Sequence, residues 1–125
     1  MRPLPRGALA ATVAAAALAA CGGDDGGGYR EPKGRAQEQV SIQGGNFFFD
    51  PDRFELPAGV NQIELVGEQG VHTLLIEGGD GYELRVEGSG DTDAKKVDLE
   101  PGEYVVYCDI PGHRSQGMEG TLTVE

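Results

Sequence analysis

Four side chains in this sequence have the chemistry of soft transition-metal ligands. They are His72, Cys108, His113 and Met118, and the last three fall within the single stretch 108–118. The chain has two histidines, two cysteines and two methionines in total, so this group contains both histidines. Imidazole nitrogen, thiolate and thioether sulfur bind transition metals, whereas calcium and magnesium prefer oxygen ligands. The residue types therefore indicate a transition-metal site.

Strand parity predicts that three of these side chains point into the core. Side chains along a β-strand alternate between its two faces, so residues an even number apart share a face. Cys108, Met118 and His72 each share parity with apolar residues of a predicted strand, and His113 lies on the loop that joins two of these strands, after the turn residues 111–112. The apolar residues of matching parity are Tyr104 and Val106, Leu122 and Val124, and Leu74 and Ile76. The four side chains are therefore expected to meet at one end of the fold.

Two imidazoles, one thiolate and one weak thioether form the ligand set of a blue-copper electron-transfer site. Zinc accepts a cysteine and two histidines but has little use for a thioether. Taken singly, each residue has a plainer interpretation: a hydrogen-bonded core histidine, a buried thiol, or a methionine that fills space. Because all four converge, the sequence predicts one copper ion that alternates between Cu(I) and Cu(II).

The elements that position these residues are predicted to be short β-strands. From residue 40 onward, alternating apolar runs are separated by turn signals, and the chain contains 21 glycines and 7 prolines. This spacing predicts an all-β, antiparallel Greek-key sandwich of about seven or eight strands. No segment has a sustained helical period, although the pattern over 81–95 does not distinguish a strand from a short helix. No run of eighteen or more apolar residues predicts a transmembrane helix.

The C-terminal part closely resembles a known family. Residues 107–124 resemble the copper loop of cupredoxins, the plastocyanin/azurin family. Residues 99–104 resemble the turn and buried tyrosine that precede the ligand cysteine there, and 72–76 resemble the strand that follows the first ligand. The resemblance covers about residues 40–125. It implies a cupredoxin-like sandwich that carries electrons through a copper ion.

The resemblance also implies a role for each ligand. His72 and His113 would bind copper through a ring nitrogen, Cys108 through a short sulfur bond, and Met118 as the weak axial ligand. Four residues separate Cys108 from His113, which is longer than the plastocyanin spacing and closer to that of auracyanin-like or rusticyanin-like members. Thr73 stands where many members have asparagine, so the hydrogen bonds around the ligands and the potential differ from the family pattern.

The same resemblance implies where a redox partner would bind. In the family the loop histidine lies near the surface amid apolar residues, which makes His113, Ile110, Pro111 and Val71 the expected contact patch. Tyr107 has the opposite parity to its neighbour and is expected to face outward. It is either a second exit for the electron or an ordinary surface tyrosine, and the latter is favoured.

The N-terminal segment has the pattern of an export signal rather than of a folded element. Residues 1–20 combine a positive start with a short apolar run. The end of this run, 18–21, resembles the lipobox of bacterial lipoproteins, which implies cleavage before Cys21 and lipidation of its sulfur. An ordinary signal peptide or a buried apolar helix is the alternative. The glycine-rich, polar segment 21–39 predicts a flexible tether, followed by a copper-binding domain over 40–125.

This organisation predicts an extracytoplasmic location on the outer face of the bacterial cytoplasmic membrane, periplasmic in a cell with two membranes. Attachment would be through the N-terminal lipid alone. If Cys21 carries lipid, Cys108 has no partner within the chain, and it is then a buried inert thiol, half of an intermolecular disulfide, or a metal ligand.

The charge balance restricts the partners. Ten basic and 21 acidic side chains give a formal net charge of −11, which argues against nucleic acid as a partner and suggests a partner with a basic docking surface. No catalytic constellation is present in the sequence, so an enzyme is not predicted. The favoured function is a monomeric, membrane-tethered carrier that shuttles one electron between redox proteins. The alternative is a copper-binding lipoprotein for copper handling or delivery.

Overall fold

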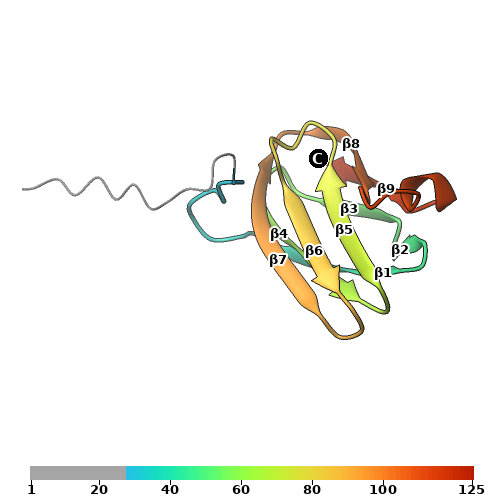
Figure 1. Ribbon diagram of the computed structural model, residues 1–125. Coiled ribbons are helices and arrows are strands. Elements are labelled where there is room, and N and C mark those ends of the chain that lie inside the picture. The colour runs from blue at the N-terminus through green and yellow to red at the C-terminus, as the bar shows by residue number, and fades with distance from the viewer. Residues whose placement is uncertain (1–27) are drawn as a thin grey trace, which may run out of the picture.

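The computed structural model describes residues 28–125. The predicted signal peptide and the predicted lipidation site, Cys21, lie outside the described residues. The folded part is a sandwich of two β-sheets (Figure 1). Among residues 28–125, no helix has the length and apolar character needed to cross a membrane.

The described residues form nine strands and one short 3-10 helix. One sheet has the order β2-β1-β4-β7 and the other has the order β3-β9-β8-β5-β6. The elements are β1 (Gln39–Gly45), β2 (Phe48–Asp50), β3 (Arg53–Leu56), β4 (Gly59–Gly67), β5 (Val71–Ile76), β6 (Glu83–Glu87), β7 (Thr92–Leu99), β8 (Gly102–Tyr107), η1 (Arg114–Gln116) and β9 (Glu119–Val124). The predicted all-β sandwich is confirmed.

The structure refines this prediction in three places. The segment 81–95 contains no helix: it consists of β6, a turn and the start of β7, and these two strands belong to different sheets. The number of strands exceeds the predicted eight because β2 and β3 are separate strands on either side of Pro51. A proline has no N–H to donate to a neighbouring strand, so it interrupts the pairing there. The predicted antiparallel pairing holds for most neighbouring strands, but β1 pairs with β4 and β3 pairs with β9 in parallel. Parallel pairing needs a long crossover connection, and the segment 46–58, with β2 and β3 in it, supplies one between β1 and β4.

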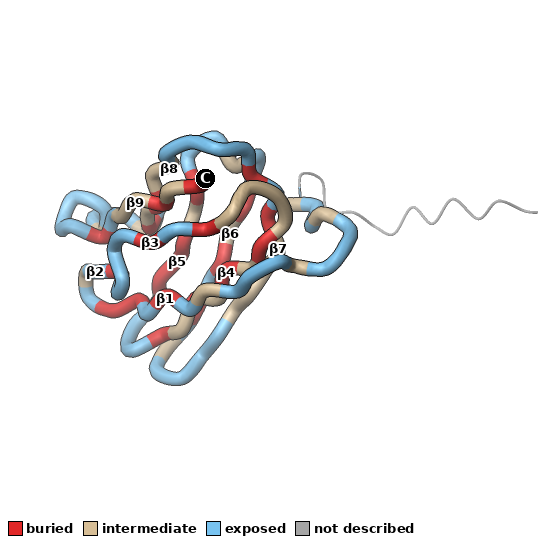
Figure 2. Tube along the Cα trace, turned by 180° about the vertical axis from the view of Figure 1, so that it is seen from behind, coloured by how far each residue is buried: buried red, intermediate tan, exposed pale blue. Residues whose placement is uncertain are grey.

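Alternating burial along the strands builds the core between the sheets. In β4, Ile63 and Leu65 have no exposed surface, while Gln62 and Glu64, which alternate with them, are half-buried. Figure 2 shows buried residues along the strands and exposed residues gathered mainly in the connections. This alternation is the burial pattern expected for sheets that cover each other on one face.

The segment from residue 29 to 38, which falls within the predicted tether, contacts β4 and β7. The Tyr29 hydroxyl donates to the Lys96 carbonyl oxygen at 2.8 Å, and the Lys96 backbone N–H donates to the Glu31 carboxylate at 2.7 Å. The Tyr29 ring packs edge-on against Tyr82 with centroids 5.1 Å apart. Burial, followed by nearby carboxylates, raises the pKa of Tyr29. These contacts satisfy polar groups on the outer edge of β7, which would otherwise lie open as a sheet edge.

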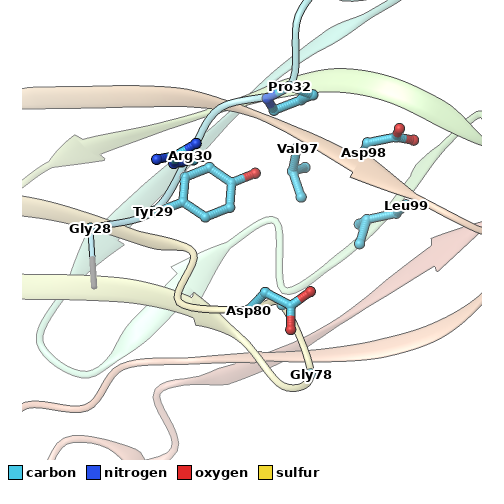
Figure 3. Close-up of a pocket in the computed structure, with 10 residues that line it drawn as sticks. Gly28, Tyr29, Arg30, Pro32, Gly78, Asp80, Val97, Asp98 and Leu99 are labelled. Atoms are coloured by element: carbon cyan, nitrogen blue, oxygen red, sulfur yellow. The ribbon is translucent and has the colours of Figure 1, made fainter. Parts of the chain in front are cut away.

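A hollow of about 720 Å³ lies beneath this segment. Figure 3 shows residues from the N-terminal segment, from β7 and from the loop after β5 around it. The hollow is lined by Gly28, Tyr29, Arg30, Pro32, Gly78, Gly79, Asp80, Val97, Asp98 and Leu99. None of the four predicted ligands belongs to this set, so the hollow is separate from the metal-ligand cluster.

Gly120 is a position where the fold leaves no room for a side chain. A Cβ atom there would lie 2.5 Å from the Asp52 carbonyl oxygen and 3.2 Å from Cγ2 of Val106. The adjacent Thr121 N–H donates to the same Asp52 oxygen at 2.8 Å, which holds the two backbones together. We expect Gly120→Ala to lower the free energy of unfolding by about 1–3 kcal/mol, as overpacking does. Urea unfolding followed by circular dichroism measures this.

Thr123→Ala is the matched control for this prediction, because Thr123 is half-buried on the same strand, where it pairs with Glu103 of β8 and Glu55 of β3. It is expected to cost less than about 1 kcal/mol. An unfolding midpoint for Gly120→Ala equal to that of the unchanged chain would show that β9 can move away from Asp52.

Candidate metal centre

Three of the predicted ligands come together at one end of the sandwich. The ligand atoms of His72, Cys108 and His113 all lie within 4.8 Å of one another. His72 and Cys108 have no exposed surface, whereas His113 is half-buried. Residues distant along the chain thus form a compact donor set that is closed toward the core and reaches the surface at His113.

Strand pairing explains how the sequence brings them together. β8 and β9 are antiparallel neighbours with Tyr107 opposite Glu119, so the next residues outward, Cys108 and Met118, lie opposite each other. The Cys108 N–H donates to the Met118 carbonyl oxygen at 3.2 Å. β5 pairs with β8, which places the β5 residue His72 beside the same end. Inward parity, as predicted, accounts for the burial of Cys108, Met118 and His72.

Backbone hydrogen bonds give the loop from Cys108 to Met118 a fixed shape. The His113 N–H donates to the Ile110 carbonyl oxygen at 3.0 Å, and the Met118 N–H donates to the His113 carbonyl oxygen at 3.2 Å. Gly117, which caps η1, has a φ of 111°, a left-handed conformation that favours glycine. The loop therefore holds the His113 ring over the site.

The environment of His72 leaves one ring nitrogen free for a ligand. Its Nε2 lies 2.7 Å from the Gln69 carbonyl oxygen, which only accepts, so Nε2 carries the hydrogen and Nδ1 carries a lone pair. This Nδ1 is buried and has no hydrogen-bond partner among residues 28–125. Burial lowers the pKa of His72. The hydrogen bond to Gln69 opposes this shift, whereas the nearby His113 adds to it. The net lowering of the pKa favours the neutral ring. A buried polar atom without a partner is unfavourable, and a bound metal ion would satisfy it.

The sulfur of Cys108 lies close to the other ligands and to Thr73. Its Sγ atom is 3.6 Å from Nδ1 of His113, and both the backbone nitrogen and the hydroxyl oxygen of Thr73 lie 3.5 Å from it. The His113 ring also packs against Phe47, with centroids 4.8 Å apart. The soft sulfur and two imidazole nitrogens fit copper, which accepts both donor types.

Met118 lies beside this group. It is fully buried. A Cβ atom on Gly44 would lie 3.4 Å from Cε of Met118 and 3.8 Å from Cβ of His72, so the absence of a side chain at Gly44 gives both residues their space.

Most of the residues predicted to contact a partner lie in the ligand loop itself. Pro111 is exposed, and Ile110 and Val71 are half-buried. A shallow hollow of about 510 Å³ lies on the outer side of the loop and includes Tyr107, Ile110 and Pro111 in its lining. Tyr107 faces outward, as expected from parity, but it is only half-exposed.

Arg114 is the reason that Tyr107 is partly covered. Its guanidinium lies 4.3 Å from the centre of the Tyr107 ring and pairs with Glu77 and Glu119, each at 2.6 Å. Hydrogen bonds to Glu77 and then Glu119 raise the pKa of Arg114. The side chain thereby ties η1 to the strands on both sides of the loop.

Several residues that shape the site were not among those predicted from the sequence. These are Gly44, Phe47, Gln69, Asp109 and Arg114. Phe47 shares parity with the buried Phe49, which was a usable signal. The contribution of Gln69 is a backbone carbonyl, so its residue type carries no information.

A family model for copper binding proteins of the plastocyanin/azurin family matches residues 36–125. No curated protein sequence matches the chain at a significant level.

Solved structures with the same fold include three auracyanins. Auracyanin B is 18% identical, with a TM-score of 0.64 over 79% of this chain and 96% of that one. Dithionite-reduced auracyanin from Roseiflexus castenholzii is 20% identical, with a TM-score of 0.60 over 73% and 99%. Auracyanin A, a blue copper protein from Chloroflexus aurantiacus, is 16% identical, with a TM-score of 0.59 over 70% and 98%. These likenesses support the fold.

The family match extends over the whole sandwich and contains all the converging ligand residues. The donor set also has the chemistry that a type 1 copper site requires. The chain therefore belongs to the plastocyanin/azurin family of copper-binding proteins.

Proposed function

We propose that this cupredoxin is an electron carrier that holds one copper ion permanently and passes single electrons between redox proteins. The observation that carries this proposal is the closed donor set: the ligand atoms of His72, Cys108 and His113 all lie within 4.8 Å of one another, and the buried Nδ1 of His72 has no hydrogen-bond partner among the described residues. Such a set is already assembled, so little movement of the protein is needed when the charge of the bound ion changes. Bound copper supplies the one-electron couple between Cu(I) and Cu(II).

The residues around the site have distinct tasks in this function. Buried His72 and Cys108 would hold a bound copper ion away from water, which would lower the local dielectric and help to set the potential. His113 is half-buried and packs on Phe47, so its ring would provide the path for the electron between the site and the surface. Arg114 keeps the loop in place through Glu77 and Glu119.

Met118 would supply the fourth, weak donor to a bound copper ion, because a buried thioether beside two imidazoles and a thiolate completes the blue-copper set. Gly44→Ala tests this assignment, since the added methyl would lie 3.4 Å from Cε of Met118 and 3.1 Å from Cδ1 of Leu65. We expect the methyl to displace the thioether, to shift the visible absorption and electron paramagnetic resonance spectra of the Cu(II) protein, and to cost about 1 kcal/mol of stability.

Gln43→Ala is the matched control for Gly44→Ala, because the neighbouring Gln43 side chain is exposed. Its spectra should equal those of the unchanged protein. Spectra of Gly44→Ala that are also unchanged would contradict the assignment of Met118 as a ligand.

Cyclic voltammetry of the copper-loaded protein in the presence of a Cu(I) chelator tests electron transfer directly. An electron carrier should show a reversible one-electron wave that persists over many cycles, because the ion stays bound in both states. Loss of the wave and transfer of copper to the chelator upon reduction would instead support copper handling or delivery.

The proposal includes an extracytoplasmic monomer that is attached to the membrane by a lipid on Cys21. Its partners would dock on the patch around His113, with Ile110 and Pro111, and carry a basic surface that complements the net charge of −11. Mass spectrometry of the protein from a bacterial membrane fraction tests the lipid. A mass that corresponds to the intact N-terminus, or to an unmodified Cys21, would contradict the anchor.

A further inference from the structure

The hydroxyl of Thr73 lies between the ligand sulfur and a carboxylate. Its oxygen is 3.5 Å from Sγ of Cys108 and 2.7 Å from Oδ1 of Asp109. The same oxygen accepts the Asp109 backbone N–H at 3.0 Å. Thr73 is 1% exposed, so its hydroxyl is enclosed by these groups rather than by solvent.

The hydroxyl has one proton, and it can donate that proton to one acceptor at full strength. The 2.7 Å distance to Asp109 is that of a hydrogen bond strengthened by a charged acceptor, whereas the sulfur, 3.5 Å away, is an intrinsically weaker acceptor. The Asp109 backbone N–H donates to the same hydroxyl oxygen, so two hydrogen bonds join Thr73 and Asp109. Together they favour the orientation in which the hydroxyl proton faces the Asp109 carboxylate. The proton therefore points to Asp109 and away from Cys108.

The sulfur is then left with one donor from Thr73, the backbone N–H at 3.5 Å. Hydrogen bonds to a ligand sulfur draw electron density from it, and a weaker sulfur donor stabilises Cu(II) less than Cu(I). Each added bond should therefore raise the reduction potential of the site.

We propose that Asp109 is a positioning residue that turns the Thr73 hydroxyl away from the Cys108 sulfur and so keeps the reduction potential low. This inference rests on the proposed electron-carrier function. Asp109 itself is exposed, and it acts on the site only through Thr73 and through its charge.

Four variants of the full chain separate the hydrogen bond from the charge. Asp109→Ala removes both the acceptor and the charge, and Asp109→Asn removes the charge but keeps an amide oxygen that can accept the hydroxyl proton. The same two changes are then made in a Thr73→Val background, which has no hydroxyl to redirect. Each protein is loaded with copper, and its reduction potential and the energy of its sulfur-to-copper absorption band are measured.

We expect Asp109→Ala to raise the potential beyond Asp109→Asn by about a tenfold change in the redox equilibrium constant, or about 59 mV for one electron. The absorption band should shift in Asp109→Ala and stay in place in Asp109→Asn. Both differences should vanish in the Thr73→Val background. If Thr73→Val does not fold, as judged by circular dichroism of the metal-free protein, Thr73→Ala replaces it as the background without a hydroxyl.

Equal potentials for Asp109→Ala and Asp109→Asn would overturn the inference, and so would a difference that persists without the Thr73 hydroxyl. In either case a reversible copper wave in the unchanged protein would leave the proposed function intact. Absence of that wave in the unchanged protein would overturn both.

Discussion

Replacing Cys108 by serine is expected to abolish the intense visible absorption of the copper-loaded protein. That absorption requires charge transfer from a thiolate to Cu(II), and Cys108 supplies the thiol sulfur that lies beside the two histidines. A serine hydroxyl has a similar size, but it is a hard and weakly acidic donor, so it cannot replace the thiolate. The site should still bind some Cu(II) through His72 and His113, with the weak, pale absorption of nitrogen and oxygen ligands.

Titration with Cu(II), followed by visible absorption and electron paramagnetic resonance spectra, measures this effect. Cys21→Ser is the matched control, because it changes the other cysteine of the chain. It should leave the absorption band at full intensity. A band of undiminished intensity in Cys108→Ser would mean that the copper ligand is not Cys108.

Copper loading is expected to raise the thermal unfolding midpoint by more than about 10 °C. Binding to the folded state alone adds about 4 kcal/mol when free metal is 1,000 times the dissociation constant, and a domain of this size gains roughly 4–8 °C for each kcal/mol. The structural reason is that the buried Nδ1 of His72 has no partner among the described residues, so the metal-free fold carries a cost that the ion removes.

Differential scanning calorimetry of the loaded and the metal-free protein checks this result. The increase should shrink strongly in Cys108→Ser, which lacks the sulfur ligand but keeps the fold. Equal midpoints with and without copper would contradict a site that is assembled in the folded state.

The sequence predicted the site well where side-chain direction follows from strand parity. His72, Cys108 and Met118 each lie at or next to the end of a strand whose alternation is clear, so their inward direction followed from local pattern alone. His113 could be placed because the loop between Cys108 and Met118 is short and its ends are paired strands.

The rest of the site depends on contacts between segments that no local pattern relates. Phe47 lies in the turn between β1 and β2 and packs against the His113 ring. Gln69 binds Nε2 of His72 through its backbone carbonyl oxygen, whose position depends on the turn before β5. In the sequence, nothing distinguishes Arg114 from an ordinary surface arginine. Its ion pair with Glu77 depends on the fold, which brings the two residues together.

The fold was predictable in class but not in its pairing. Alternation of apolar residues gives the strands and their inner faces, yet it contains no information about which strand lies beside which. The parallel pairing of β3 with β9 joins residues 53–56 to 121–124, and that depends on how the whole chain closes. Pro51 divides β2 from β3 and sends them into different sheets, which the turn signal at Asp50–Pro51 indicated only as a break.

X-ray absorption at the copper edge of the loaded protein would identify the atoms bound to the ion. We expect a coordination shell with one short sulfur contact and two imidazole nitrogens, in both the oxidised and the reduced protein. A shell of nitrogen and oxygen alone would contradict this expectation, as would a reduced protein that has lost its copper.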